Sequence, residues 1–395
     1  MVFCGLLEGA EKRSQQEIII MTLESQWKHK YGILKAFISS NPEIHIGGYE
    51  VYIPEAQRDK FYKYFDNVRM AIVESWSSSF TFDVYALSKN YIESENKLSK
   101  TLNCNIQLPL DLSSFLHNPK EGMMRLIYNR LFELVQGKIP EDDFEWIVEG
   151  DLAADATAMF RIGCEAWVAL ALIILLEPDE LLGIALDGDN RPLITEMREI
   201  AFGRQFHHPA KRIPEFIFHS KKLDSYVALK MPLAREVNSY DIPIEIPTQR
   251  LLRNRNGDTS SVLDHRMIFL SVVPDLKKTP IYADIHKRTI NGPDLTIEFL
   301  MEQDLSDSEI IGQVQNRVEI MKPRFGGNIV LMDPKSKSGS FKIMENIDAF
   351  STGLEQSRLE PIIDKLVWQS TINFSSGGDE MVNEIKNMNQ RIAKF

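Results

Sequence analysis

Three acidic residues in the middle of the chain are of the type that binds metal ions in proteins. Glu149 is followed by a glycine, and Asp187 and Asp189 form an Asp-x-Asp pair further along the chain. Carboxylate oxygens are the ligands that Mg²⁺ prefers in proteins, and a pair of such ions can hold the attacking and leaving oxygens of a phosphodiester. Glu149, Asp187 and Asp189 are therefore candidate catalytic and metal-binding residues for phosphodiester chemistry.

The elements expected around these acids would bring them together. Residues 144–148 and 182–186 are short apolar runs that fit strands, the first ending at Glu149 and the second at Asp187. A helix is expected between them, and another is expected from Arg191. If the two strands are parallel neighbours, their carboxyl ends meet at one edge of the sheet.

This pattern of an acid at one strand end and Asp-x-Asp at another resembles the Toprim domain of topoisomerases, primases and related nucleases. The resemblance covers residues 143–203. It implies a small α/β sheet, bound Mg²⁺ and cleavage, joining or synthesis of nucleic-acid strands. In that family pattern Glu149 matches the glutamate, and Asp187 and Asp189 match the Asp-x-Asp.

One other interpretation of the same residues remains open. Glu149 could lie on an acidic helix surface, and residues 187–190 could form a solvated turn, because Asp, Gly and Asn favour turns. A calcium-binding EF-hand loop is excluded, because positions six and twelve, which require Gly and Glu, hold Pro192 and Arg198.

A basic segment follows the acidic region and is a candidate contact surface. We expect it to touch phosphate groups or an acidic protein surface, for which residues 141–155 are one candidate, or to be a solvated linker. Its candidate contact residues are Arg204, His207, His208, Lys211, Arg212, Lys221 and Lys222.

The longest apolar run, residues 166–176, is expected to be a core element. A membrane-spanning helix needs about 20 apolar residues, and Asp155, Arg161 and Glu165 interrupt the N-terminal extension of this run. A segment that is apolar on all sides must be covered on all sides. We therefore predict a buried helix around which other segments pack, and no association with a membrane.

The pattern of elements predicts an α+β protein, with a helical N-terminal half and a C-terminal domain that has a mixed or antiparallel sheet and closing helices. Amphipathic helical segments dominate residues 1–202, which we expect to form a mainly helical domain. Residues 203–225 are expected to be a basic linker. Short β-rich runs separated by turn signals predict an α+β domain over residues 226–395.

Charge and cysteine content narrow the class of protein. The net charge is −11, and residues 101–200 carry 18 acidic against 7 basic side chains. Bulk charge thus gives no support for nonspecific binding of nucleic acid. Three cysteines without a CxxC pattern fit a reducing compartment, and no basic residue precedes the short apolar patch at the N-terminus, so no secretory signal is expected. The cytoplasm is the expected location.

Two functions from different classes remain. The first is a non-catalytic interaction or assembly protein, a subunit of a larger complex that needs no cofactor and contacts a protein partner or a second copy of itself. The second is a Mg²⁺-dependent, Toprim-like enzyme that acts on nucleic acid. We favour the first, because charge is segregated along the chain and many aromatic residues lie on amphipathic helices.

Overall fold

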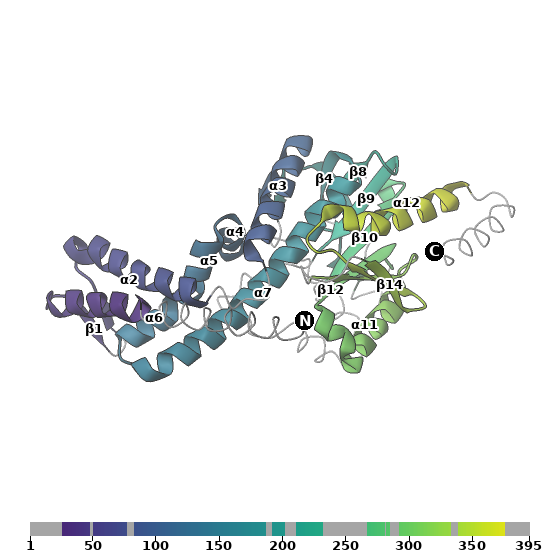
Figure 1. Ribbon diagram of the computed structural model, residues 1–395. Helices are drawn as coiled ribbons and strands as arrows, with labels where there is room; N and C mark the ends of the chain where they lie inside the picture. The colour runs from purple at the N-terminus through teal and green to yellow at the C-terminus, as the bar shows by residue number, and fades with distance from the viewer. Residues whose placement is uncertain are drawn as a thin grey trace, which may run out of the picture. The chain divides into compact units, whose positions relative to one another are not determined.

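The computed structural model describes residues 26–47, 50–76, 83–186, 192–201, 211–231, 267–280, 282–284, 292–332 and 339–375 (Figure 1). The chain folds into two units, and each is discontinuous in sequence. The first consists of Met1–Tyr85 and Ser114–Phe160, and the second consists of Ala86–Ser113 and Arg161–Phe395. The predicted α+β class, with a helical N-terminal half and a mixed sheet in the C-terminal part, is confirmed.

The first unit is a helical assembly with one short hairpin. A helix over 26–39 is followed by strands β1 and β2, and the other elements are α2, α5, α6 and the first part of α7. Their bounds are β1 His45–Gly47, β2 Glu50–Tyr52, α2 Glu55–Trp76, α5 Pro119–Leu126, α6 Tyr128–Val135 and α7 Glu141–Leu175.

Aromatic side chains fill the core of the first unit. Phe61 and Phe65 of α2 are fully buried, and the Phe65 ring lies 4.5 Å from Phe132 of α6, centroid to centroid. Tyr128 lies one turn before Phe132, with ring centroids 5.0 Å apart. Such clusters bury large apolar areas and add ring–ring attraction. The aromatic residues on these helices therefore serve packing, as their helical spacing predicts.

The second unit is built on a nine-stranded sheet with the order β14-β15-β13-β12-β10-β9-β8-β4-β5. β12, β13 and β15 are parallel neighbours, and every other neighbouring pair is antiparallel. The strand bounds are β4 Pro178–Leu186, β5 Pro192–Glu196, β8 Phe216–Ser220, β9 Ser225–Lys230, β10 Met267–Val273, β12 Leu295–Leu300, β13 Gly327–Leu331, β14 Gly339–Met344 and β15 Ile347–Ser351.

Helices and short elements complete the second unit. The helices are α3 Val84–Leu102, the remainder of α7, α11 Ser308–Met321 and α12 Glu360–Ser375, and α4 Leu110–His117 begins in the second unit and ends in the first. Two small two-stranded sheets pair β3 Asn105–Gln107 with β6 Glu199–Ala201, and β7 Lys211–Arg212 with β11 Ala283–Asp284. The 3-10 turns are η2 Leu276–Lys278, η3 Glu302–Ser306 and η4 Gln356–Leu359.

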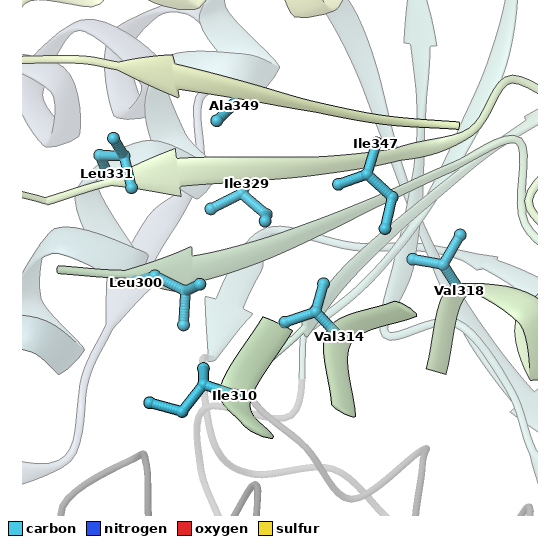
Figure 2. Packing of buried hydrophobic residues seen from close by; sticks show 8 residues of the cluster. All are labelled: Leu300, Ile310, Val314, Val318, Ile329, Leu331, Ile347 and Ala349. Atoms are coloured by element: carbon cyan, nitrogen blue, oxygen red, sulfur yellow. The ribbon is translucent and has the colours of Figure 1, made fainter. Parts of the chain in front are cut away.

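α11 connects two parallel strands, β12 and β13, and covers one face of the sheet (Figure 2). Its apolar side chains recur at a spacing of four, which places them on one face of the helix. They meet alternate residues of β12, β13 and β15, because successive residues of a strand point to opposite faces. The cluster comprises Leu300, Ile310, Val314, Val318, Ile329, Leu331, Ile347 and Ala349.

A buried ion pair also joins α11 to the sheet. Arg317 donates from Nε to Oε1 of Glu298 at 3.2 Å and from Nη2 to Oε2, and both residues are buried. Burial raises the pKa of the Glu298 carboxyl, and the neighbouring Arg317 opposes that rise. The paired guanidinium and carboxylate fix the position of α11 along β12, since either charge alone would be costly at this depth.

α7 passes from the first unit into the second as one helix. It is long and apolar enough to cross a membrane, but 89% of its most apolar window is buried inside the protein. Residues 166–173 of α7 are no more than 1% exposed. The predicted buried core helix over the longest apolar run is confirmed.

The domain boundaries differ from those expected at residues 202 and 226. The sheet already begins with β4 and β5, and the expected linker 203–225 contains β8, an interior strand between β9 and β4. Residues 86–113 belong to the second unit although they precede α7. Short-range patterning identifies elements, but it does not reveal that distant segments pair in one sheet.

Candidate functional site

Glu149 does not lie at the end of a strand. The prediction of a strand over 144–148 was wrong, because these residues lie in α7. Three acids occupy the first turn of this helix, where they interact favourably with the partial positive charge of the helix N-terminus. Phe144, Val148 and Leu152, four residues apart, are at most 1% exposed, whereas Glu149 is exposed to solvent.

The strand before Asp187 is present, but its neighbours differ from the prediction. β4 pairs antiparallel with β5 on one side and with β8 on the other, and the helix expected from Arg191 is wrong, because residues 192–196 form β5. Asp187 and Asp189 lie outside the described residues. The described part of the candidate metal site is therefore one exposed glutamate on a helix.

The basic segment is held by carboxylates where the structure describes it. His219 Nδ1 lies 2.7 Å from Asp179 Oδ1, Lys221 Nζ lies 3.9 Å from the same carboxyl group, and Lys222 Nζ lies 3.2 Å from Asp364 Oδ1. Lys221 and Lys222 are thus the members of the predicted contact surface whose surroundings are described.

The other members of that predicted surface are described only in part or not at all. Lys211 and Arg212 form β7, with their side chains outside the described residues. Arg204, His207 and His208 lie outside the described residues.

An exposed face of α7 in the first unit brings an aromatic ring and acidic groups together, and we name it the α7 acidic face. It consists of Asp142, Asp143, Trp146 and Glu149. Asp142, Trp146 and Glu149 follow one another at spacings of four and three, which puts them on one side of the helix. Trp146 is 68% exposed, and the three acids are exposed as well.

The apolar side of α7, together with Glu145 beside it, is fixed to the helix over 26–39. The ring centroids of Trp27 and Phe144 are 5.2 Å apart, and Trp27 Nε1 donates to Glu145 Oε1 at 3.1 Å. Lys28 Nζ lies 3.0 Å from the same Glu145 oxygen. The ring of Trp146 is thus presented from a helix that cannot rotate without breaking buried contacts.

The acids of the α7 acidic face lack the ion pairs that neighbouring acids of the helix make with described lysines. Glu141 and Glu145 are neutralised by lysines of the helix over 26–39. Asp142, Asp143 and Glu149 make no ion pair with any described residue. Three carboxylates without an ion-pair partner among the described residues therefore lie on the same side of α7 as one exposed indole, and this arrangement attracts cationic, partly apolar groups.

Comparison of the chain with protein-family models, with curated proteins and with solved structures found no match.

Sequence reasoning identified the acids of this region but not the role of Trp146, which it assigned to a strand. The available signal was helical: Phe144, Val148 and Leu152 recur every four residues, and Trp146 falls outside that apolar face. A large aromatic residue on the polar side of an amphipathic helix is the pattern that could have identified it.

Proposed function

We propose that this chain is a non-catalytic interaction protein, a subunit of a larger cytoplasmic complex, and that the α7 acidic face binds a basic segment of a partner protein. The observation that supports this most is the 68% exposure of Trp146 among carboxylates that have no ion-pair partner among the described residues. Cys104 and Cys164 are buried free thiols, which suits the reducing cytoplasm.

Trp146 is suited to anchor such a contact. Tryptophan is among the residues most enriched at the energetic centres of interfaces, where truncation to alanine costs about 2 kcal/mol or more. Its backbone is already fixed in a helix, so only the rotamer freedom of the side chain is lost when a partner covers it. Burial of the exposed indole supplies affinity.

The surrounding carboxylates define the chemistry of the partner. Asp142, Asp143 and Glu149 favour arginine and lysine, and they speed the encounter with a cationic segment. An amphipathic helix with apolar residues on one face and basic residues beside them satisfies both the indole and the acids. We therefore name a basic amphipathic helix as the occupant of this face.

The test uses the full-length chain and two synthetic peptides. One is an amphipathic helix of leucine and lysine, and the other replaces each lysine by glutamate. Fluorescence anisotropy of the labelled peptides gives the dissociation constants. The expected result is saturable binding of the lysine peptide, with binding of the glutamate peptide weaker by about 10-fold or more, since charge complementarity selects the cationic partner.

Trp146→Ala should weaken binding of the lysine peptide by about 30-fold, which corresponds to about 2 kcal/mol. Tyr85→Ala is the matched control, because Tyr85 is also a largely exposed aromatic residue, at 60%, and its removal should leave binding unchanged. Circular dichroism shows whether each variant is folded. Equal affinity for both peptides, or unchanged affinity in Trp146→Ala, contradicts the proposal.

A further inference from the structure

The loop between α11 and β13, in the second unit, is held rigidly by its backbone. Lys322 ends the helix with a left-handed conformation at φ 46°, and the next residues turn back towards the start of β12. Arg324 N donates to Pro293 O at 3.0 Å, and Phe325 N donates to Asp294 O at 2.8 Å. The side chains of this loop are therefore presented from a fixed backbone.

The guanidinium of Arg324 is fixed as well. Its Nε donates to Asp294 Oδ1 at 2.6 Å, and its carbon Cζ lies 4.7 Å from the centre of the Phe325 ring. Asp294 is 5% exposed and accepts a further bond at Oδ2 from the Val272 backbone N–H at 2.6 Å. Arg324 Nη2 also lies 2.5 Å from Asp294 Oδ1, and the side chain nevertheless remains 52% exposed. The outer N–H groups of Nη1 and Nη2 are therefore the donors left for a ligand.

A hollow of about 310 Å³ lies beside this guanidinium. Lys278, Lys322 and Arg324 line it, and Asp294 is the one carboxylate among its described lining residues. That carboxylate is already bonded to Arg324 and to a backbone N–H. Lys278 is 84% exposed, with Asp275 3.9 Å away. The hollow therefore has an excess of positive charge.

We propose that this hollow binds the phosphate group of a small phosphorylated molecule. A phosphate carries several strong acceptor oxygens, and a guanidinium offers two parallel N–H donors that match them. The ammonium groups of Lys278 and Lys322 supply further charge. Ser271 also lines the hollow, and its hydroxyl lies 2.9 Å from the Tyr282 hydroxyl, where either group can be the donor.

A second, larger hollow adjoins the first and has room for the rest of the ligand. Its volume is about 1030 Å³, and Lys322 and Arg324 line it as well. Its other charged lining residues are three carboxylates, Glu319, Glu345 and Asp348, and one ammonium, Lys365, whose Nζ donates to Asp348 Oδ2 at 2.8 Å. A phosphate in the small hollow and an uncharged organic portion in the large hollow match this division of charge.

The carboxylates of the larger hollow make a nucleic-acid backbone a poor ligand. Glu319 and Glu345 line it and are exposed. A strand with one phosphate for every nucleotide would carry negative charge past both, and like charges in a shared site repel. The balance of charges therefore favours one terminal phosphate over a polyanion.

Isothermal titration calorimetry of the full-length chain tests the proposal. The probes are inorganic phosphate, AMP, adenosine and a short single-stranded DNA. Saturable binding of inorganic phosphate is expected at about millimolar concentration, and AMP should bind about 10-fold more tightly if the larger hollow holds its organic portion. Adenosine, which lacks the phosphate, should not bind measurably.

Two substitutions remove cations without disturbing the fold. Lys278 is on the surface, so Lys278→Ala changes no packing. Lys322→Gly removes the ammonium at a left-handed position, where glycine is at least as favourable as lysine. The double variant should weaken AMP binding by about 10-fold or more, because two of three cations are lost. Lys89→Ala, on α3 and 74% exposed, is the control and should bind as the unaltered chain does.

The possible results are distinct. Binding of phosphate and AMP that is lost in the double variant and kept in Lys89→Ala supports the proposal. Absence of saturable binding by either phosphate or AMP, or undiminished binding in the double variant, overturns it. DNA that binds more tightly than AMP overturns the assignment to a small ligand. This site lies in the second unit, so none of these results bears on the α7 acidic face.

Discussion

Asp155, in the first unit, is a carboxyl group whose environment opposes its charged form. Burial raises the pKa of its carboxyl to about 6 from 3.8, and repulsion from Asp151 adds to the rise, while Arg130 opposes it. Arg130 cannot cancel these effects, because its Nε already lies 2.7 Å from Asp151 Oδ2 and its Nη1 lies 2.8 Å from Glu133. The folded chain therefore binds a proton at Asp155 more tightly than the unfolded chain does.

This raised pKa predicts that the folded chain loses stability as the pH rises. The favourable protonated state is fully present below pH 3.8, and the stability that it gives is lost as the pH rises through about 6. Asp155→Asn removes the titrating group, so the variant should unfold at a higher temperature than the unaltered chain at about pH 7.5, with the difference vanishing near pH 3.5. Differential scanning calorimetry across this range measures it. Asp59→Asn, at an exposed position, is the control, and an advantage of Asp155→Asn that is constant with pH contradicts the explanation.

At the scale of residues, the sequence predicted which acids cluster but not where they point. Asp142, Asp143 and Glu149 were recognised as an acidic region from their types alone. Their common exposure with Trp146 follows from the helix that carries them. The Toprim-like interpretation predicts a strand over residues 144–148 of this helix, whereas the alternative, with Glu149 on an acidic helix surface, agrees with the structure. A helix repeats about every 3.6 residues and a strand every 2. When a helix is taken for a strand, each side chain is therefore assigned to the wrong face.

Helices and strands with consistent patterns were predictable as elements. α2, with helical spacing of Phe61, Phe65 and Val68, lies in the region that was expected to be helical, and β10 and β12 lie in the region where short β-rich runs were expected. The start of α7 was misassigned, because alternating apolar residues at 144–148 imitate a strand. β5 was expected to be a helix, since its pairing with β4 depends on tertiary contacts that propensity does not include.

Two glycines test whether close approach or helix propensity decides the stability of the helical elements. A Cβ at Gly122 of α5 would lie 2.4 Å from Phe115 Cα and 2.8 Å from Phe115 N of α4, and these backbone atoms cannot move aside. Gly150 lies within α7 with no atom within 4 Å of the same added group. Both positions belong to the first unit. The same substitution is therefore crowded at Gly122 and unhindered at Gly150.

Gly122→Ala should destabilise the chain by about 1 to 3 kcal/mol, because the added methyl overpacks a closed contact. Gly150→Ala should stabilise it by about 0.5 to 1 kcal/mol, since alanine is the better helix former. The effect on the unfolded chain is alike for both variants, so the difference between them reports on the folded structure. Urea unfolding of both variants gives the free energies, and a loss of stability in Gly150→Ala would contradict the assignment of that position to an open helix surface.

For the attraction of a basic partner, the distribution of charge along the chain matters more than the net charge. The net charge of −11 arises within residues 101–200, which contain 18 acidic and 7 basic side chains. The α7 acidic face lies in this region. If it attracts a basic partner, the effect must come from charges within roughly one screening length, about 8 Å at physiological salt, and not from the overall charge.

This distinction gives a prediction that separates local from global charge. Glu149→Lys and Asp59→Lys change the net charge by the same amount, but only Glu149 belongs to the α7 acidic face; Asp59 is an exposed residue of α2 in the same unit. In stopped-flow measurements with the leucine–lysine peptide, the association rate of the unaltered chain should fall by about 10-fold between 50 and 300 mM salt, because screening removes electrostatic steering. Glu149→Lys should lower the rate at low salt and flatten this dependence, whereas Asp59→Lys should leave both nearly unchanged. Equal effects of the two substitutions would show that the total charge, and not the α7 acidic face, attracts the peptide.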